Sequence, residues 1–147
     1  MIAETYLPAG LPIPVAERHG LSAPYLEGLR AGRLMVQRNP RTGLHIFPPQ
    51  HIAWDDLCFD LEWVEVAPTG LIYSWTRVWR PVHPALAEAC PYIVVVVELP
   101  HASGVRMLGN LLGDPRQEVE IGAPVEAVFE HHHDAQPPFT LAQWRRA

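Results

Sequence analysis

The chain has 147 residues, of which 48% are hydrophobic, so it can bury a core as one domain or as one domain with a small appendage. Its formal net charge of -5 argues against a nucleic-acid-binding protein, which needs a basic surface for phosphates. All eleven basic residues are arginine, which excludes Schiff-base chemistry and Walker-type phosphate binding through a lysine.

Cysteine content and hydropathy bear on the compartment. The two cysteines, Cys58 and Cys90, make no disulfide framework, so we expect a reducing, cytoplasmic environment. No secretory leader is recognisable, and no apolar run approaches the roughly 18 residues of a membrane helix. We therefore expect no membrane partner.

The N-terminal part of the chain predicts an arm followed by one helix. Residues 1–14 are rich in proline and glycine and show no periodicity, as in an arm that lies on a surface. Residues 23–32 predict a short helix, with Ser22 as its N-cap, Pro24 in its first turn and Gly32 as its stop.

Residues 32–56 have the layout of a small zinc ribbon, in which two knuckle turns flank a Phe-Pro-Pro step. A working ribbon places Cys-x-x-Cys in each knuckle, because four thiolates complete the shell of a structural zinc. Those four positions are occupied here by Asn39, Thr42, Ala53 and Asp56. We therefore predict a degenerate, metal-free lobe.

Two replacements for the lost zinc can be weighed. The favoured one is a hydrophobic plug formed by Phe47, Ile52, Trp54 and Leu57. The other is a replacement metal held by polar side chains whose spacing matches no familiar knuckle, namely His45, His51, Asp55 and Cys58.

From residue 61 onward the signals are those of short strands with fixed connections. Strands are predicted by alternation and by β-branched or aromatic content at residues 62–66, 71–80, 92–99, 105–112, 119–122 and 125–130, and residues 137–147 are expected to form a tail. Residues 92–99 are apolar on both faces, so the lobe, the helix or another chain should cover the outer face.

The segment 71–80 combines aromatic and arginine side chains. Strict alternation would place Leu71, Tyr73, Trp75, Arg77 and Trp79 on one face, and Ile72, Ser74, Thr76, Val78 and Arg80 on the other. Arginine and aromatic residues are common at interfaces and suit adenine rings and phosphates. Trp75, Arg77 and Arg80 are therefore candidate contacts to coenzyme A or to a partner protein, although a core-and-rim role fits most of the segment.

No recognisable set of catalytic residues emerges. There is no Gly-x-Ser-x-Gly elbow and no ordered Cys-His-acid series, so the sequence gives no sign of catalysis by this chain itself. Glu98 is the carboxylate expected to be partly buried, and pairing with Arg106 across a hairpin is its simplest explanation. In the run from His131 to His133, alternation allows at most the first and third residues to share a metal.

Four segments in order resemble one known family. The ribbon-like residues 32–56, PTGLIYSWTRV at 68–78, PYIVVVVEL at 91–99 and GAPVEAVFE at 122–130 resemble the acyl-CoA-associated OB-fold family known as domain of unknown function 35. The resemblance implies a mainly β protein: an arm and helix (1–35), a degenerate ribbon lobe (36–66) and a five-stranded OB barrel with a tail (67–147).

The resemblance also implies a function. Members of the family act as small subunits or fused domains of thiolase-like acyltransferases and retro-aldolases, or pair with hot-dog-fold enoyl-CoA hydratases. A non-catalytic accessory subunit that shields an acyl-CoA site is the leading hypothesis, with acyl-CoA as ligand of the complex and no zinc. The alternatives are a free-standing acyl-CoA-binding protein and, against the acidic charge, a single-stranded nucleic-acid binder.

Overall fold

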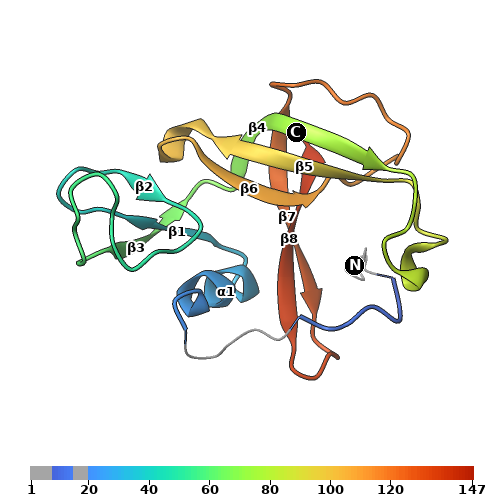
Figure 1. Ribbon diagram of the computed structural model, residues 1–147, viewed down its shortest axis with the longest axis horizontal. Helices are drawn as coiled ribbons and strands as arrows, with labels where there is room; N and C mark the ends of the chain where they lie inside the picture. Colours follow the sequence, from blue (N-terminus) through green and yellow to red (C-terminus); the bar gives the residue numbers. More distant parts are fainter. Residues whose placement is uncertain (1–7, 15–19) are drawn as a thin grey trace.

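The computed structural model describes residues 8–14 and 20–147, and β-strands dominate it (Figure 1). Five strands form one sheet in the order β6-β5-β4-β7-β8, and three shorter strands form another in the order β2-β1-β3. The elements are α1 (Ala23–Arg30), β1 (Leu34–Arg38), β2 (His45–Ile46), β3 (Glu62–Val66), β4 (Thr69–Val78), β5 (Tyr92–Leu99), β6 (Val105–Asn110), β7 (Pro124–His132) and β8 (Phe139–Arg146). None of the described helices is long and apolar enough to cross a membrane.

The five-stranded sheet curls until its two edge strands meet. Leu111, just after β6, forms a parallel bridge to Trp144 of β8, and the N–H of Leu112 donates to the carbonyl of Trp144 at 2.8 Å. This seam nearly closes the sheet into a barrel. The prediction of a mainly β protein with a five-stranded OB barrel is therefore confirmed.

The predicted tail is wrong, because residues 139–146 form β8, the last strand of the barrel. β8 pairs with β7 from Val125↔Arg146 to His132↔Phe139. Trp144 is 0% exposed and belongs to the main hydrophobic core. The sequence misled because the alternation of this strand is short and follows two prolines that look like the start of a disordered end.

The strand predicted at residues 119–122 is also absent. This segment is part of the connection between β6 and β7, and Gly122 turns the chain with a φ of 85°. The connection is tied to β4 by two backbone hydrogen bonds, from Gly122 N to Ile72 O and from Ile72 N to Ala123 O. The alternating pattern of residues 119–122 therefore belongs to a loop, which packs along β4 and adds no strand to the sheet.

The helix starts at Ala23, as predicted, and ends at Arg30, two residues before the predicted stop at Gly32. Pro24 lies in the first turn, but the side chain of Ser22 makes no capping hydrogen bond, so its expected capping role is not observed. The chain leaves the helix through Gly32, whose φ of 68° suits glycine. Leu29 is buried, and the Tyr25 ring packs at 5.1 Å from Phe47, where burial raises the pKa of Tyr25 to about 12.

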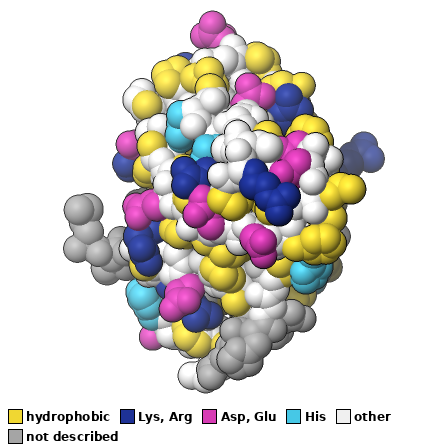
Figure 2. Space-filling view, turned by 90° about the vertical axis from the view of Figure 1, so that its left-hand side faces the viewer, with side chains coloured by type: hydrophobic (Ala, Val, Ile, Leu, Met, Phe, Trp, Pro, Cys, Tyr) yellow, Lys and Arg dark blue, Asp and Glu magenta, His cyan; other side chains and the backbone are white. Residues whose placement is uncertain are grey.

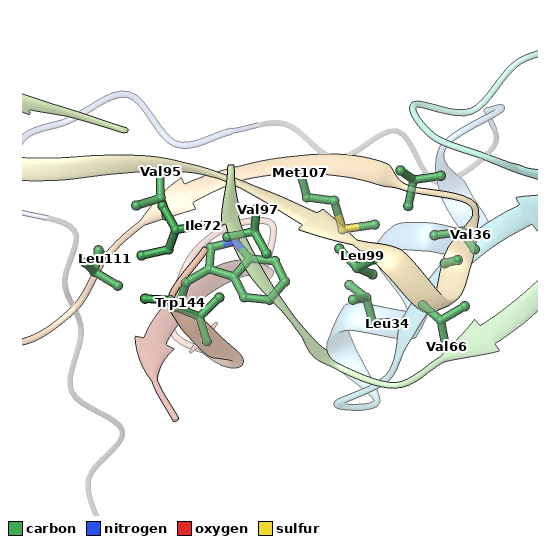
Figure 3. Packing of buried hydrophobic residues seen from close by; sticks show 14 of the residues in the cluster. Leu34, Val36, Val66, Ile72, Val95, Val97, Leu99, Met107, Leu111 and Trp144 are labelled. Carbon is green, nitrogen blue, oxygen red and sulfur yellow. The ribbon is translucent and has the colours of Figure 1, made fainter. Parts of the chain in front are cut away.

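One core joins the helix, the three-stranded lobe and the barrel. Figure 3 shows Leu34, Val36 and Val66 of the lobe beside Leu99 and Met107 of the barrel. The lobe is therefore fixed to the barrel by shared packing. Residues of α1 line one pocket together with Val94 of β5.

The lobe is held by hydrogen bonds where a ribbon would hold zinc. Asn39 is 0% exposed, and its amide donates to Asp55 Oδ1 at 3.0 Å and to Asp56 Oδ1 at 2.7 Å. The hydroxyl of Thr42 donates to Asp55 Oδ2 at 2.6 Å. Three of the four predicted knuckle positions thus meet in one polar network, and the fourth, Ala53, is buried.

The predicted hydrophobic plug is wrong, because none of its four residues belongs to the small core of the lobe. Trp54 and Leu57 are exposed, so they do not fill the lobe. Its small core consists instead of Ile46, Ala53 and Cys58, flanked by Leu44 and Leu61. The described residues contain no group of three or more His, Cys, Asp and Glu side chains placed to hold a metal.

The seam residue gives a first prediction. Trp144→Ala should lower the free energy of unfolding by about 3–5 kcal/mol, because it leaves a cavity in the main core. Chemical denaturation followed by circular dichroism measures the change. Trp54→Ala is the matched control: its side chain is exposed, so it should change stability by less than about 0.5 kcal/mol. Equal effects of the two variants would contradict the assignment of residues 139–146 to the barrel.

The polar network gives a second prediction. Asn39→Ala should destabilise the protein by about 1–3 kcal/mol, because two carboxylates lose their shared donor. Asn39→Asp should be worse at neutral pH, since it adds a third carboxylate, and acidification should recover part of the loss. Thermal unfolding of both variants at pH 7 and pH 5 tests this. A wild-type Tm that falls on addition of a zinc chelator would contradict a lobe held by this network.

Candidate functional site

A β-bulge in β4 decides which side chains enter the candidate site. The register with β5 shifts between Ile72 and Ser74, so Tyr73 is the extra residue. Beyond the bulge, Trp75 pairs with the buried Val95 and lies on the same face as Ile72. The predicted grouping of Trp75 and Arg77 with Leu71 and Tyr73 is therefore wrong, because one extra residue moves the rest of a strand to the other face.

Trp75 and Arg77 line a cleft at the side of the barrel. The cleft has a volume of about 490 Å³. Its lining comes from β4, from the connection between β6 and β7 and from the end of β8: Trp75, Arg77, Arg116, Gln117, Glu118, Val119, Glu120 and Arg146. Trp75 and Val119 also pack against the main core, so the floor of the cleft is continuous with the barrel interior.

Arg77 fixes the wall of this cleft. Its Nε donates to the carbonyl of Pro115 at 2.9 Å, and its Nη2 donates to the carbonyl of Gln117. Gln117 in turn donates from its side chain to the carbonyl of Leu112 at 3.0 Å. Because its donors serve the backbone, Arg77 positions the loop more than it offers charge to a ligand.

Cation–π contacts extend from Arg77 along the surface. Its guanidinium carbon lies 5.4 Å from the Trp75 ring centre and 5.9 Å from that of Trp79. The guanidinium carbon of Arg116 also lies 5.4 Å from the Trp79 ring centre. Such stacking holds guanidinium groups and indole rings in place together. The result is a preorganised surface of flat aromatic and planar cationic groups.

Arg116 and Arg146 are the charges available to a ligand. Both are exposed, and neither takes part in the ion pairs found among residues 8–14 and 20–147. Guanidinium groups bind phosphate in bidentate geometry, and indole faces suit a purine ring. Glu118 and Glu120 line the same cleft and would disfavour a highly anionic ligand placed near them.

An apolar cavity lies beside the same connection. It has a volume of about 380 Å³, and Pro115 lines it while the next residue, Arg116, lines the cleft. The other contributors are mostly apolar: Pro8, Leu11, Leu86, Ala89, Pro91, Tyr92, Ile93, Asn110, Leu111, Leu112 and Gly113. A polar cleft and an apolar cavity thus share one loop as their border.

The structure brings together two of the three residues predicted for the site. Arg80 is exposed, lies two residues beyond the end of β4 and does not line the cleft, so its contact with a ligand or partner stays a prediction. Arg116 and Arg146 are not among the residues predicted for the site, because only the fold of the connection and of β8 places them beside Trp75. The Arg-Arg pair at the chain end was visible, but it was assigned to a tail.

The other candidate carboxylates, Glu98 and Glu130, form contacts within the fold. Arg106 Nε donates to Glu98 Oε2 at 3.1 Å, which confirms the predicted pair. The most buried carboxylate among the described residues is instead Glu130, at 1% exposure, which accepts from Gln143 Nε2 at 2.9 Å. The Glu130 carboxylate also lies 3.2 Å from His132 Nε2.

One serine–histidine contact was not foreseen. Ser103 Oγ lies 3.0 Å from His45 Nδ1 and also accepts from the backbone N–H of His45 at 3.0 Å. Burial, followed by the nearby charges of Arg38 and His101, lowers the pKa of His45. Because the same hydroxyl binds the backbone, this contact joins the lobe to the β5–β6 turn and does not form a nucleophilic pair.

The comparisons with known proteins agree with this fold. The model of the family described as "ChsH2, C-terminal OB-fold domain" matches residues 63–130. The chain is 34% identical over 123 residues to a probable enoyl-CoA hydratase alpha subunit of Thermomonospora curvata, and 32% identical over 120 residues to the 3-oxo-4,17-pregnadiene-20-carboxyl-CoA hydratase alpha subunit of Mycobacterium tuberculosis. These matches cover 84% and 82% of the chain, but only 36% of each relative's length.

Two of the similar solved structures match most of the chain. One, described as "Ltp2-ChsH2(DUF35) aldolase", has a TM-score of 0.75 and 32% identity, covering 91% of this chain and 98% of the other. The second, a DUF35 protein of unknown function from Sulfolobus solfataricus, has a TM-score of 0.56 and 15% identity, covering 84% of this chain and 83% of the other, and supports the fold alone. The chain therefore belongs to the DUF35 family of OB-fold proteins.

Proposed function

We propose that this protein is a non-catalytic accessory subunit of an acyl-CoA-processing enzyme complex, with a thiolase-like acyltransferase or retro-aldolase as its catalytic partner. The observation that carries the proposal is the 32% identity over 98% of the DUF35 chain in a solved aldolase. In this arrangement the partner supplies the catalytic groups, and the OB barrel helps to form or shield the acyl-CoA site.

A hot-dog-fold enoyl-CoA hydratase is the alternative partner. It is favoured by the two curated relatives, whose names describe hydratase alpha subunits. Because this chain spans 36% of each of them, nearly two thirds of each relative lies outside the comparison. The aldolase chain is matched over nearly its full length, so we rank that class of partner first.

The candidate site suits one end of an acyl-CoA molecule. Coenzyme A carries phosphates and an adenine ring, which match the exposed guanidinium groups of Arg116 and Arg146 and the indole ring of Trp75. The acyl or pantetheine part is less polar and matches the cavity on the other side of Pro115. We assign the cleft to the nucleotide end, with its phosphates at Arg116 and Arg146 and away from Glu118 and Glu120. Arg77 holds the loop between the two subsites.

The partner is tested by purifying the tagged chain from its native cells and recording native mass spectra of what accompanies it. A stoichiometric thiolase-like subunit supports the proposal, and a hot-dog-fold subunit supports the alternative. A chain that purifies as a bare monomer or homodimer would contradict both and favour a free-standing acyl-CoA-binding protein.

The ligand assignment gives a third prediction. Arg116→Ala and Arg146→Ala should each weaken binding of acetyl-CoA and palmitoyl-CoA to the complex by about tenfold or more, because each removes a charge-assisted hydrogen bond worth about 1.5–3 kcal/mol. Isothermal titration calorimetry measures the affinities. Arg145→Ala is the control, because Arg145 precedes Arg146 on β8 but pairs with Glu126 at 2.6 Å on the other face.

The same titrations distinguish the roles of Arg77 and Arg80 in binding. Arg77→Ala should weaken binding and also loosen the β6–β7 connection, which proteolysis of that connection would detect. Arg80→Ala tests the expected contact beyond the cleft. If Arg145→Ala weakened binding as much as Arg116→Ala, a general loss of positive charge would explain the result, and the cleft would not be the CoA site.

A further inference from the structure

The N-terminal arm forms one wall of the apolar cavity that Pro115 borders. We call residues 8–14 the strap. Of these seven residues, Pro8 and Leu11 are half-buried and the other five are exposed. Pro8 and Leu11 are also the two strap residues that line the cavity. The side chains that the strap buries are therefore the ones that close one side of the cavity.

The strap lies beside the connection between β4 and β5. Figure 1 shows both segments on the side of the molecule away from the lobe, and Pro8 and Ala9 share a second hollow with the segment 84–89 of that connection. Figure 2 shows charged and hydrophobic side chains interspersed on the lobe side, whereas the cavity beside the strap is lined mostly by apolar residues. Such a lining suits an apolar group of a ligand.

No hydrogen bond fastens the strap to the barrel. Its backbone makes none to any other part of the chain that the structure describes. Pro8, Pro12 and Pro14 have no N–H, so the strap is poorly suited to a β-ladder. Gly10 turns the chain with a φ of 90°, which glycine adopts without strain. A segment with few buried contacts and no backbone hydrogen bonds to its surroundings opens at a low cost in free energy.

The lining of the cavity favours the acyl group of an acyl-CoA over its pantetheine part. Pantetheine contains amide groups, whose donors and acceptors need partners when they leave water. Tyr92 and Asn110 are the only residues with polar side chains in the lining that the structure describes. An acyl chain needs no such partners, and its burial is favourable because it removes apolar surface from water.

We infer that the strap is a movable wall of an acyl-binding cavity, which opens to admit the acyl group of an acyl-CoA and closes over it through Pro8 and Leu11. This inference rests on the proposed function. It adds which part of the ligand the cavity takes and which segment controls its entry. The cavity has a volume of about 380 Å³ with the strap in place, so a ligand and the closed strap can be accommodated together.

Leu11→Ser tests the contact between strap and ligand. Because it replaces an apolar part of the wall, the affinity of the purified complex for palmitoyl-CoA should fall about fivefold or more, while its affinity for CoA without an acyl group should stay within about twofold. Isothermal titration calorimetry measures both. Ile13→Ser is the matched control, because Ile13 belongs to the same strap, is 44% exposed and does not line the cavity. Unchanged affinity of Leu11→Ser for palmitoyl-CoA, or an equal loss with Ile13→Ser, would overturn the inference.

A disulfide between the strap and the β4–β5 connection tests whether the strap has to open. A Cβ placed on Gly10 would lie 3.6 Å from the Cβ of Ala85, within the range of about 3.5–4.5 Å that disulfides span. We therefore combine Gly10→Cys with Ala85→Cys and add Cys90→Ser to prevent wrong pairing. In the oxidised protein, association and dissociation of palmitoyl-CoA should both slow about tenfold or more, because the closed strap blocks passage of the ligand. Reduction with dithiothreitol should restore both rates, which stopped-flow measurements follow.

The outcomes distinguish this inference from the proposed function. Equal rates in the oxidised and reduced protein, with the disulfide confirmed by mass spectrometry, would overturn the role of the strap and leave the accessory subunit standing. Binding of palmitoyl-CoA that is weakened by Arg116→Ala but not by Leu11→Ser would place the acyl group outside the cavity and overturn the inference alone. A complex that binds neither palmitoyl-CoA nor CoA would contradict both.

Discussion

The seam between β6 and β8 holds one wall of the candidate cleft in place. At this seam Trp144 fills the core, and its carbonyl accepts from Leu112, the residue from which the β6–β7 connection departs. The side chain of Gln117 donates to the carbonyl of the same Leu112. Arg77 of β4 donates to the carbonyl of Pro115 in the connection. The cleft therefore has one wall that exists only because the barrel closes, and the closing strand also brings Arg146 to it.

Most of the fold could be predicted from the sequence, because its strands are short apolar runs separated by proline and glycine. The prediction failed where the conformation of a short segment depends on pairing with residues distant in the sequence. The bulge at Tyr73 leaves no mark in composition, yet it decides that Trp75 and Arg77 face the cleft. β8 resembles a tail until its pairing with β7 is known. For the same reason Arg116 and Arg146 could not be assigned to the site from spacing alone.

The lobe is held by a polar network at positions where the sequence pattern predicts zinc knuckles. Four thiolates around zinc and one amide between two carboxylates both link distant turns, but the second needs a buried donor with correct geometry. Asn39 provides that donor, since it is fully buried and binds both Asp55 and Asp56. The sequence predicted three members of this network, Asn39, Thr42 and Asp56, as knuckle positions. It could not reveal that Asp55, outside the four predicted knuckle positions, would complete the network.

The shared core ties two separate surfaces of the molecule to each other. The lobe lies at one end of the molecule, and the β6–β7 connection runs over another part of the barrel (Figure 1). The shared core through Leu34, Val36, Leu99 and Met107 fixes one to the other. Because the core is continuous, the position of the lobe also fixes where the arginine and tryptophan cleft lies relative to it.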